Sequence, residues 1–241
     1  ETSSPRCGKP TLLDFVLMVT LAVLALALRW PAMHESLWID ELHTAWAISG
    51  GLGELPARCA IGNQSPVWFL LPWLSTRFFG LNEIALRLPS LLASVAVVPA
   101  IYCLTRWWSL SRAAALVAAL LAVADHQFLT FATEARPYAW VQLVGVLQVI
   151  VFWRCLQSPS WITRLGWIGL TALLFYLHYT AILLVVGEIL FVLVSLAVSS
   201  KALKYDGKML AIDMLLLALM LTPTMGHLTD IAGRRDNWTQ F

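Results

Sequence analysis

Charged side chains are scarce in this chain of 241 residues. Asp, Glu, Lys and Arg make up 12% of it, whereas hydrophobic residues make up 59% and the mean hydropathy is +0.75. Soluble domains carry about twice that share of charge. The shortage of charge therefore excludes an ordinary soluble domain. It predicts a polytopic membrane protein whose helices are buried in lipid and against one another.

Three other features are missing. The four cysteines, at positions 7, 59, 103 and 155, have no metal-type spacing, and only Cys59 is expected on the outer side, so neither a disulfide framework nor a zinc site is predicted. No internal repeat or low-complexity linker divides the chain. No signal-peptide cleavage site is visible, and the first apolar run, residues 12–31, is long enough to remain as a helix.

Long apolar runs predict the fold class, an all-α polytopic membrane helix bundle with about seven spans. Interfacial helices are expected in the first outer loop, residues 32–83. Basic flanks at Arg6 and Lys9 place the start of the first span on the cytoplasmic side. We treat residues 1–241 as one transmembrane domain and expect it to be incomplete at the C-terminus. The predicted spans are residues 12–31, 84–105, 113–131 and 138–156, two short helices within 165–199, and 209–225.

The run 165–199 is too long for one span and short for two. Lys201, Lys204 and Lys208 follow it, and a single helix would place them outside. The positive-inside rule therefore favours a break near residues 178–180 and places His178 on the outer side.

Two short helices are expected in the first outer loop. Asp40 is a good N-cap and Gly50-Gly51 a good stop, which predicts a helix over 41–49. Residues 66–79 are apolar but short for a span and contain Pro72, which suits an interfacial or re-entrant helix.

The predicted outer side collects residues that can carry chemistry. A carboxylate such as Asp40 can act as a general base, and Arg136 is suited to phosphate because its fork matches phosphate oxygens. A Glu and a His brought together, here Glu134 and His178, can bind a divalent metal.

Structural alternatives stay open for each of them. Asp40 can serve only as a helix cap beside Glu41. Glu134 and Arg136 can form an ion pair that closes a turn before Pro137, and His178 can be a packed, hydrogen-bonded histidine.

Five short motifs in this order resemble the membrane glycosyltransferases of the GT-C fold, most closely the dolichyl-phosphate-mannose–protein mannosyltransferase-like group that includes the bacterial aminoarabinose transferases. The resemblance covers most of the chain. The motifs are Trp38-Ile39-Asp40-Glu41, the stretch from Gln64 to Leu71, Ala85-Leu86-Arg87-Leu88-Pro89-Ser90, Glu134-Ala135-Arg136-Pro137-Tyr138, and Leu177-His178-Tyr179-Thr180.

The resemblance implies roles for these residues. Asp40, with Glu41 beside it, matches the catalytic acid that deprotonates the acceptor. Glu134 matches an acidic position that assists a metal or the acceptor, and Arg136 would neutralise the departing phosphate. His178 matches a metal-binding histidine of the aminoarabinose transferases. Arg87 and Tyr138 lie in the matching motifs and are predicted, with Glu134 and Arg136, to bind substrate.

The resulting prediction is an inverting glycosyltransferase of the plasma or inner membrane, or of the endoplasmic reticulum, with its active face periplasmic, extracellular or lumenal. Its expected partners are a polyprenyl-phosphate-linked sugar, membrane lipid, and an acceptor protein, lipid or glycan, with no nucleic acid. A divalent metal is the one cofactor considered. The alternative is a catalytically silent relative that serves as a structural subunit of a larger membrane complex.

Overall fold

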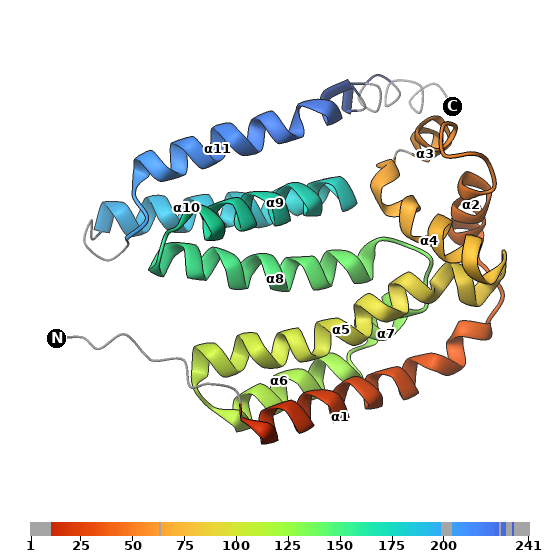
Figure 1. Ribbon diagram of the computed structural model, residues 1–241, viewed down its shortest axis with the longest axis horizontal. Helices are drawn as coiled ribbons and strands as arrows, with labels where there is room; N and C mark the ends of the chain where they lie inside the picture. The colour runs from red at the N-terminus through yellow and green to blue at the C-terminus, as the bar shows by residue number, and fades with distance from the viewer. Residues whose placement is uncertain (1–10, 63, 199–203, 227, 230–232, 234–241) are drawn as a thin grey trace. The chain divides into compact units, whose positions relative to one another are not determined.

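The computed structural model describes residues 11–62, 64–198, 204–226, 228, 229 and 233, and within them it contains helices and turns but no strand (Figure 1). The predicted all-α class is therefore confirmed. The chain divides into two compact units, which are described separately. Unit 1 comprises Glu1–Ser49 and Leu70–Val146, and unit 2 comprises Gly50–Phe69 and Leu147–Phe241.

The long helices of unit 1 begin at residues whose side chains cap the helix N-terminus. Helix α1, Leu12–Arg29, begins at Thr11, whose hydroxyl accepts from the Asp14 amide while the Asp14 carboxylate accepts from the Thr11 amide. Helix α5, Glu83–Ser109, is capped by Asn82 and ends at Leu110, a non-glycine residue with φ of 56°. The 3₁₀ turn η1, Trp30–His34, extends α1 to the first outer loop.

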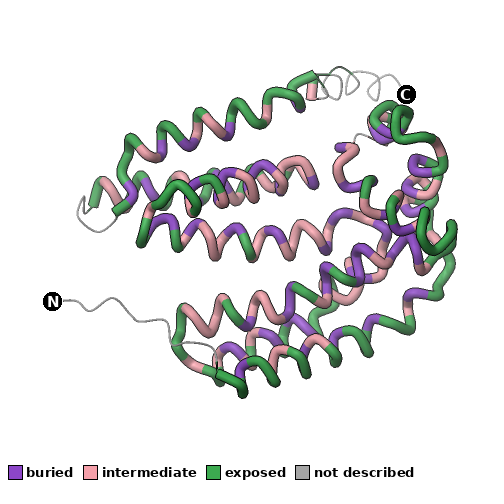
Figure 2. Tube along the Cα trace, in the orientation of Figure 1, coloured by how far each residue is buried: buried purple, intermediate pink, exposed green. Residues whose placement is uncertain are grey.

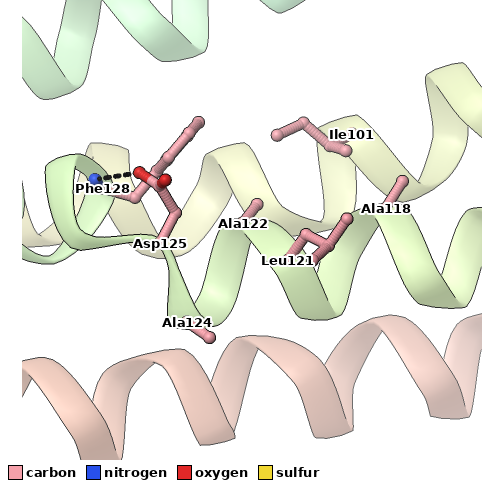
Figure 3. A pocket seen from close by; sticks show the side chains of 7 residues that line it. All are labelled: Ile101, Ala118, Leu121, Ala122, Ala124, Asp125 and Phe128. Carbon is pink, nitrogen blue, oxygen red and sulfur yellow. Dashed lines mark hydrogen bonds between the residues drawn. The ribbon is translucent and has the colours of Figure 1, made fainter.

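The predicted third span is interrupted. Residues 113–131 form two helices, α6 (Arg112–Ala124) and α7 (His126–Ala132), which meet at an angle of 57°. Asp125 lies at the break, where its carboxylate accepts a hydrogen bond from the Phe128 amide and so caps α7 (Figure 3). The predicted span is therefore divided at Asp125, whose carboxylate caps a new helix.

Arg29 and Ser94 donate hydrogen bonds to the two helices that meet at this break. The buried Arg29 side chain donates from Nη2 to the Ala122 carbonyl, at 3.2 Å, and from Nε to Ser94 Oγ, at 2.9 Å. Ser94 in turn donates to the Phe128 carbonyl, at 3.1 Å. The Ala122 carbonyl, in the last turn of α6, needs a partner from outside the helix, and Arg29 of α1 supplies it.

Apolar packing joins α1, α5 and α6, which lie alongside one another in Figure 1. At the predicted inner end the buried Asp14 carboxylate binds Tyr102 Oη at 2.8 Å and Arg112 Nε at 3.1 Å, which ties the same three helices together. Figure 2 shows the buried positions along each helix. The buried core consists of Leu21, Ala25, Val97, Val98, Tyr102, Ala115, Ala119 and Val123.

The predicted break near His178 is confirmed. Helix α9, Trp161–Leu177, ends where His178 adopts an extended backbone, and after the 3₁₀ turn η2, Tyr179–Ala181, helix α10 runs from Ile182 to Val198. Unit 2 also holds most of α8, Tyr138–Gln157, and all of α11, Gly207–Leu221, followed by the 3₁₀ turn η3, Thr222–Thr224. Lys201 lies outside the described residues.

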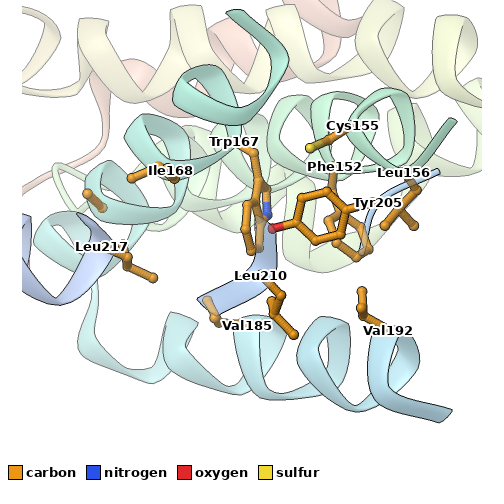
Figure 4. Close-up of a cluster of buried hydrophobic side chains, with 11 residues drawn as sticks. Phe152, Cys155, Leu156, Trp167, Ile168, Val185, Val192, Tyr205, Leu210 and Leu217 are labelled. Atoms are coloured by element: carbon orange, nitrogen blue, oxygen red, sulfur yellow. The ribbon is translucent and has the colours of Figure 1, made fainter. Parts of the chain in front are cut away.

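Unit 2 has its own core, centred on Trp167, whose ring contacts the rings of Phe152 and Tyr205 (Figure 4). A buried ion pair lies beside it, in which Arg164 Nη2 and Asp213 Oδ1 are 2.7 Å apart and Tyr205 Oη donates to Asp213 Oδ2 at 2.6 Å. The remaining core residues are Cys155, Leu156, Ile168, Ala172, Val185, Val192, Leu210 and Leu217.

Each of the seven predicted spans is helical. By length and hydropathy, five described segments can cross a membrane, and the α6–α7 pair is a sixth if it acts as one broken span. Helix α9 is apolar but, at 17 residues, shorter than those five. The chain is therefore an integral membrane protein with a polytopic helical fold.

The first outer loop holds three short helices instead of two. Helix α2, Ile39–Ile48, has Trp38 as its N-cap residue, so the predicted N-cap at Asp40 is wrong; the Glu41 carboxylate accepts from the Trp38 amide at 3.3 Å and makes the earlier start possible. Helix α3, Leu55–Ile61, was not predicted. Helix α4, Pro66–Phe79, has the predicted bounds, with Pro72 inside it.

Candidate functional site

Asp40 and Glu41 are adjacent in the first turn of α2 but lie in opposite environments. The Asp40 side chain is 42% exposed, whereas Glu41 is fully buried. Successive residues of a helix point about 100° apart, so one carboxylate faces the solvent side of the loop and the other faces α5. Of these two carboxylates, only that of Asp40 is substantially exposed.

Glu41 forms a buried, two-point ion pair with Arg87 of α5. Arg87 Nε donates to Glu41 Oε1 at 2.7 Å and Nη2 donates to Oε2 at 2.6 Å. The remaining donors of Arg87 reach main-chain carbonyls of the outer loop, with Glu35 at 2.7 Å and Ser36 at 3.2 Å among them. Every nitrogen of Arg87 thus donates within the protein. Its predicted contact with substrate stays a prediction, and its observed contacts are structural.

The second outer loop, residues 133–137, is fastened to this ion pair. The Ala135 amide donates to Glu41 Oε1 at 2.8 Å, and Thr44 Oγ1 donates to the Ala135 carbonyl at 3.0 Å. Ser90 Oγ donates to the Arg136 carbonyl at 3.1 Å. Thr44 and Ser90 were not among the predicted site residues, although Ser90 closes one of the motifs. These bonds fix the two outer loops of unit 1 against each other.

Arg136 faces Asp40 across the two loops. Its Nη2 lies 3.6 Å from Asp40 Oδ2, and its guanidinium lies 5.6 Å from the centre of the Tyr138 ring, with Nη2 3.4 Å from Tyr138 Oη. The Arg136 side chain is mostly buried, whereas Asp40 is half exposed. The structure therefore brings together an accessible carboxylate, a guanidinium and a phenol from motifs almost a hundred positions apart.

Glu134 lines a cavity of about 360 Å³ beside this group. Burial raises the pKa of Glu134 above its ordinary value, the negative charges of Glu41 and Asp40 raise it further, and Arg136 and Arg87 oppose that rise. Carboxyls with raised pKa values in a cavity are typical of functional sites. The cavity is lined by Glu35, Ser36, Trp38, Glu41, Arg87, Thr130, Thr133 and Glu134.

His178 belongs to unit 2 and lies where α9 ends. Its Nδ1 is 2.7 Å from Thr180 Oγ1. Glu134 belongs to unit 1, so the predicted metal site that joins them stays a prediction. In the part of the chain that the structure describes, no group of three or more His, Cys, Asp and Glu side chains is arranged to hold a metal ion.

Comparison with known proteins gives one finding. The family model described as dolichyl-phosphate-mannose-protein mannosyltransferase matches residues 63–226, which is more than half of the chain. No curated protein and no solved structure matches the chain. The matched range includes the motifs around Arg87, Glu134 and His178, and α2 with Asp40 and Glu41 precedes it.

Proposed function

Because the chain belongs to the dolichyl-phosphate-mannose-protein mannosyltransferase family, and is thus a membrane glycosyltransferase of the GT-C type, we propose that it transfers a sugar from a polyprenyl phosphate to an acceptor with inversion at the anomeric carbon. The observation that carries this proposal is the meeting of Asp40 and Arg136 at 3.6 Å on the outer-loop end of unit 1. A base for the acceptor and a cation for the leaving phosphate are the two groups that the reaction needs.

Asp40 is the proposed general base. Its carboxylate takes a proton from the acceptor hydroxyl or amine as the acceptor forms a bond to the anomeric carbon. The bond from that carbon to the phosphate oxygen breaks on the opposite side, and the electron pair leaves with the polyprenyl phosphate. Glu41 is unsuited to this step because both of its oxygens are occupied by Arg87 in a buried pair.

Arg136 is the proposed partner of the leaving phosphate. An arginine stays charged and can present two donors to phosphate oxygens, and the Tyr138 ring orients its plane. Because Asp40 already lies near Arg136, a bound phosphate would compete with Asp40 for the guanidinium. Donor binding would then release Asp40 toward the acceptor.

Glu41 and Arg87 are proposed as positioning residues. They hold α2, α5 and the Ala135 amide in one arrangement, and so set the separation between Asp40 and Arg136. The predicted metal site at Glu134 and His178 is kept as a proposal for the full enzyme, and no step above depends on it.

The direct test is a transfer assay on the purified full-length protein. A polyprenyl-phosphate mannose labelled in the sugar is supplied with candidate acceptors, and label in the acceptor and free polyprenyl phosphate are both measured. We expect labelled acceptor and free polyprenyl phosphate to appear in equal amounts. The transferred sugar should have the anomeric configuration opposite to that in the donor. Donor binding without turnover toward any acceptor would instead support the structural-subunit alternative.

Glu134 provides a prediction about pH. We propose that Glu134, in its ionised form, assists the acceptor. Because its pKa is raised, it keeps its proton to a higher pH than an ordinary glutamate, and activity should therefore rise with pH in a window above about 4.3. In Glu134→Gln the rise of kcat/KM with pH should begin at a lower pH. The plateau of kcat/KM at higher pH should fall about tenfold or more. An acidic limb at the same pH in both proteins would exclude Glu134 from the reaction.

The outer face of the membrane is the proposed location of the site. In unit 1 the Asp40 and Glu134 loops lie at one end of the helices, and Arg106 and Arg112 lie at the other, where the positive-inside rule places the cytoplasm. Cysteines introduced at positions 134 and 204 should therefore differ in labelling by an impermeant thiol reagent added from outside, with only position 134 labelled. Equal labelling in intact cells would contradict this orientation.

A further inference from the structure

Unit 2 carries an acidic residue in the middle of a membrane span. Glu188 lies halfway along the apolar segment Tyr179–Val198 and is buried, with 7% of its surface exposed. Two donors contact it, Gln148 Nε2 at 2.7 Å and Trp167 Nε1 at 3.0 Å, and both reach the same oxygen, Oε2. The carboxyl thus joins three helices, α8, α9 and α10.

No cation accompanies this carboxyl. Among the described residues Glu188 takes part in no ion pair. Arg164, the nearest basic residue along α9 to Trp167, is bound by the Asp213 carboxylate, which also accepts from Tyr205. Within unit 2, the titratable groups of the helices that form this core with α10 are Arg154 and Cys155 on α8, Arg164 and Tyr176 on α9, and Lys208 and Asp213 on α11, with Tyr205 before it.

Two buried oxygens at this position lack a donor. Glu188 Oε1 and Gln148 Oε1 are both buried without a hydrogen-bond partner in the described part of the chain. Gln148 Nε2 already donates two hydrogen bonds, one to Glu188 Oε2 and one to Thr171 Oγ1. An ionised carboxylate would therefore leave a full charge and two unsatisfied acceptors inside an apolar core, which is costly.

Protonation of Glu188 avoids the cost of this buried charge and of the unsatisfied acceptors. A hydrogen on Glu188 Oε1 cancels the buried charge and turns an acceptor without a donor into a donor. The neighbouring Gln148 carbonyl oxygen, on the side chain that already bonds the same carboxyl, is the unsatisfied acceptor available to it. We propose that Glu188 is a proton-binding site of the membrane-embedded part of unit 2, occupied at neutral pH, with Gln148 and Trp167 as the residues that hold it.

Asp213 provides an internal comparison. It is also buried within unit 2, yet it receives two nitrogens of Arg164 and the Tyr205 hydroxyl. That environment favours the ionised form of the carboxyl. These two buried acids, Glu188 and Asp213, should therefore carry different protonation states at the same pH.

Infrared spectroscopy of the full-length protein in lipid nanodiscs at neutral pH tests the proposal. We expect a C=O stretching band of a protonated carboxyl that disappears in Glu188→Gln and persists in Asp213→Asn. A spectrum without this band, or a band unchanged in Glu188→Gln, would overturn the proposal. Dicyclohexylcarbodiimide, which reacts with protonated carboxyls in membranes, should likewise modify Glu188 and leave Asp213 unmodified, as read by peptide mass spectrometry. Suppression of that modification by Na⁺ would point to a metal cation on an ionised Glu188 and would also overturn the proposal.

A stability comparison gives a second, independent measure. Gln closely matches the shape of the neutral acid, so Glu188→Gln should keep the melting temperature of the natural protein, whereas Asp213→Asn should lower it by leaving Arg164 unpaired. An equal loss in the two variants would mean that Glu188 acts as a charge.

Discussion

Replacing Asp40 with Asn is expected to reduce sugar transfer by about 10²- to 10⁴-fold, the range that a positioned general base contributes. Asn has the shape of Asp but cannot accept the acceptor's proton. The side chain is half exposed and its contact with Arg136 is 3.6 Å long, so the fold should tolerate the change. The measurement is kcat for transfer together with the dissociation constant of the polyprenyl-phosphate sugar, which should not rise, because Asn competes with the phosphate for Arg136 less than Asp does.

Glu83→Gln is the matched control for Asp40→Asn. Glu83 also lies exposed in the first turn of a helix, α5, and takes no part in the site. It should retain full transfer. If Asp40→Asn retained the activity of this control, Asp40 would have no place in the mechanism and the structural-subunit alternative would gain support.

The largest effect on stability is expected from Arg87→Met. The change leaves Glu41 buried and fully desolvated with no cation, and removing one partner of a buried ion pair costs about 3–5 kcal/mol. It also takes donors away from the carbonyls of the outer loop, including Glu35 and Ser36. We expect a lower melting temperature in detergent and loss of transfer through displacement of α2 and the Ala135 loop.

Two further variants make this prediction specific. Arg58→Met breaks the exposed Arg58–Glu54 pair of α3, and exposed pairs contribute only about 0–1 kcal/mol, so its melting temperature should barely move. The double variant Glu41→Leu/Arg87→Met removes both charges and should recover part of the lost stability without recovering transfer. A melting temperature for Arg87→Met equal to that of Arg58→Met would show that the buried pair does not hold the loops.

Local properties of the sequence were sufficient for most of the long helices, but not for α3 or for the division between α6 and α7. Apolar length and the lysines after residue 199 predicted the break at His178, and the bounds of α4 followed from its short apolar run. The break at Asp125 was missed because the three polar residues 125–127 are short compared with the apolar runs before and after them, and average hydropathy does not register a capping carboxylate.

The motifs predicted several residues that the structure brings together, but not the contacts between them. The motifs identified Asp40, Glu41, Glu134 and Arg136, yet adjacency in sequence suggested that Asp40 and Glu41 act alike. Their difference depends on Arg87, which lies 46 positions away from Glu41 in the chain. A contact of that kind follows from how α2 packs on α5, and no pattern within either motif encodes it.

The break between α6 and α7 has a consequence for the mechanics of the site. Its two halves are bound by Arg29 and Ser94, and α7 leads within a few residues into the loop that carries Glu134 and Arg136. An apolar recess of about 500 Å³ opens at the same bend, between α5 and α6 (Figure 3). Arg29, whose Nη2 donates to the Ala122 carbonyl, holds one of the residues that line this recess. The bend therefore links the buried Arg29 and Ser94, through the short helix α7, to the loop whose Ala135 amide is bound by Glu41.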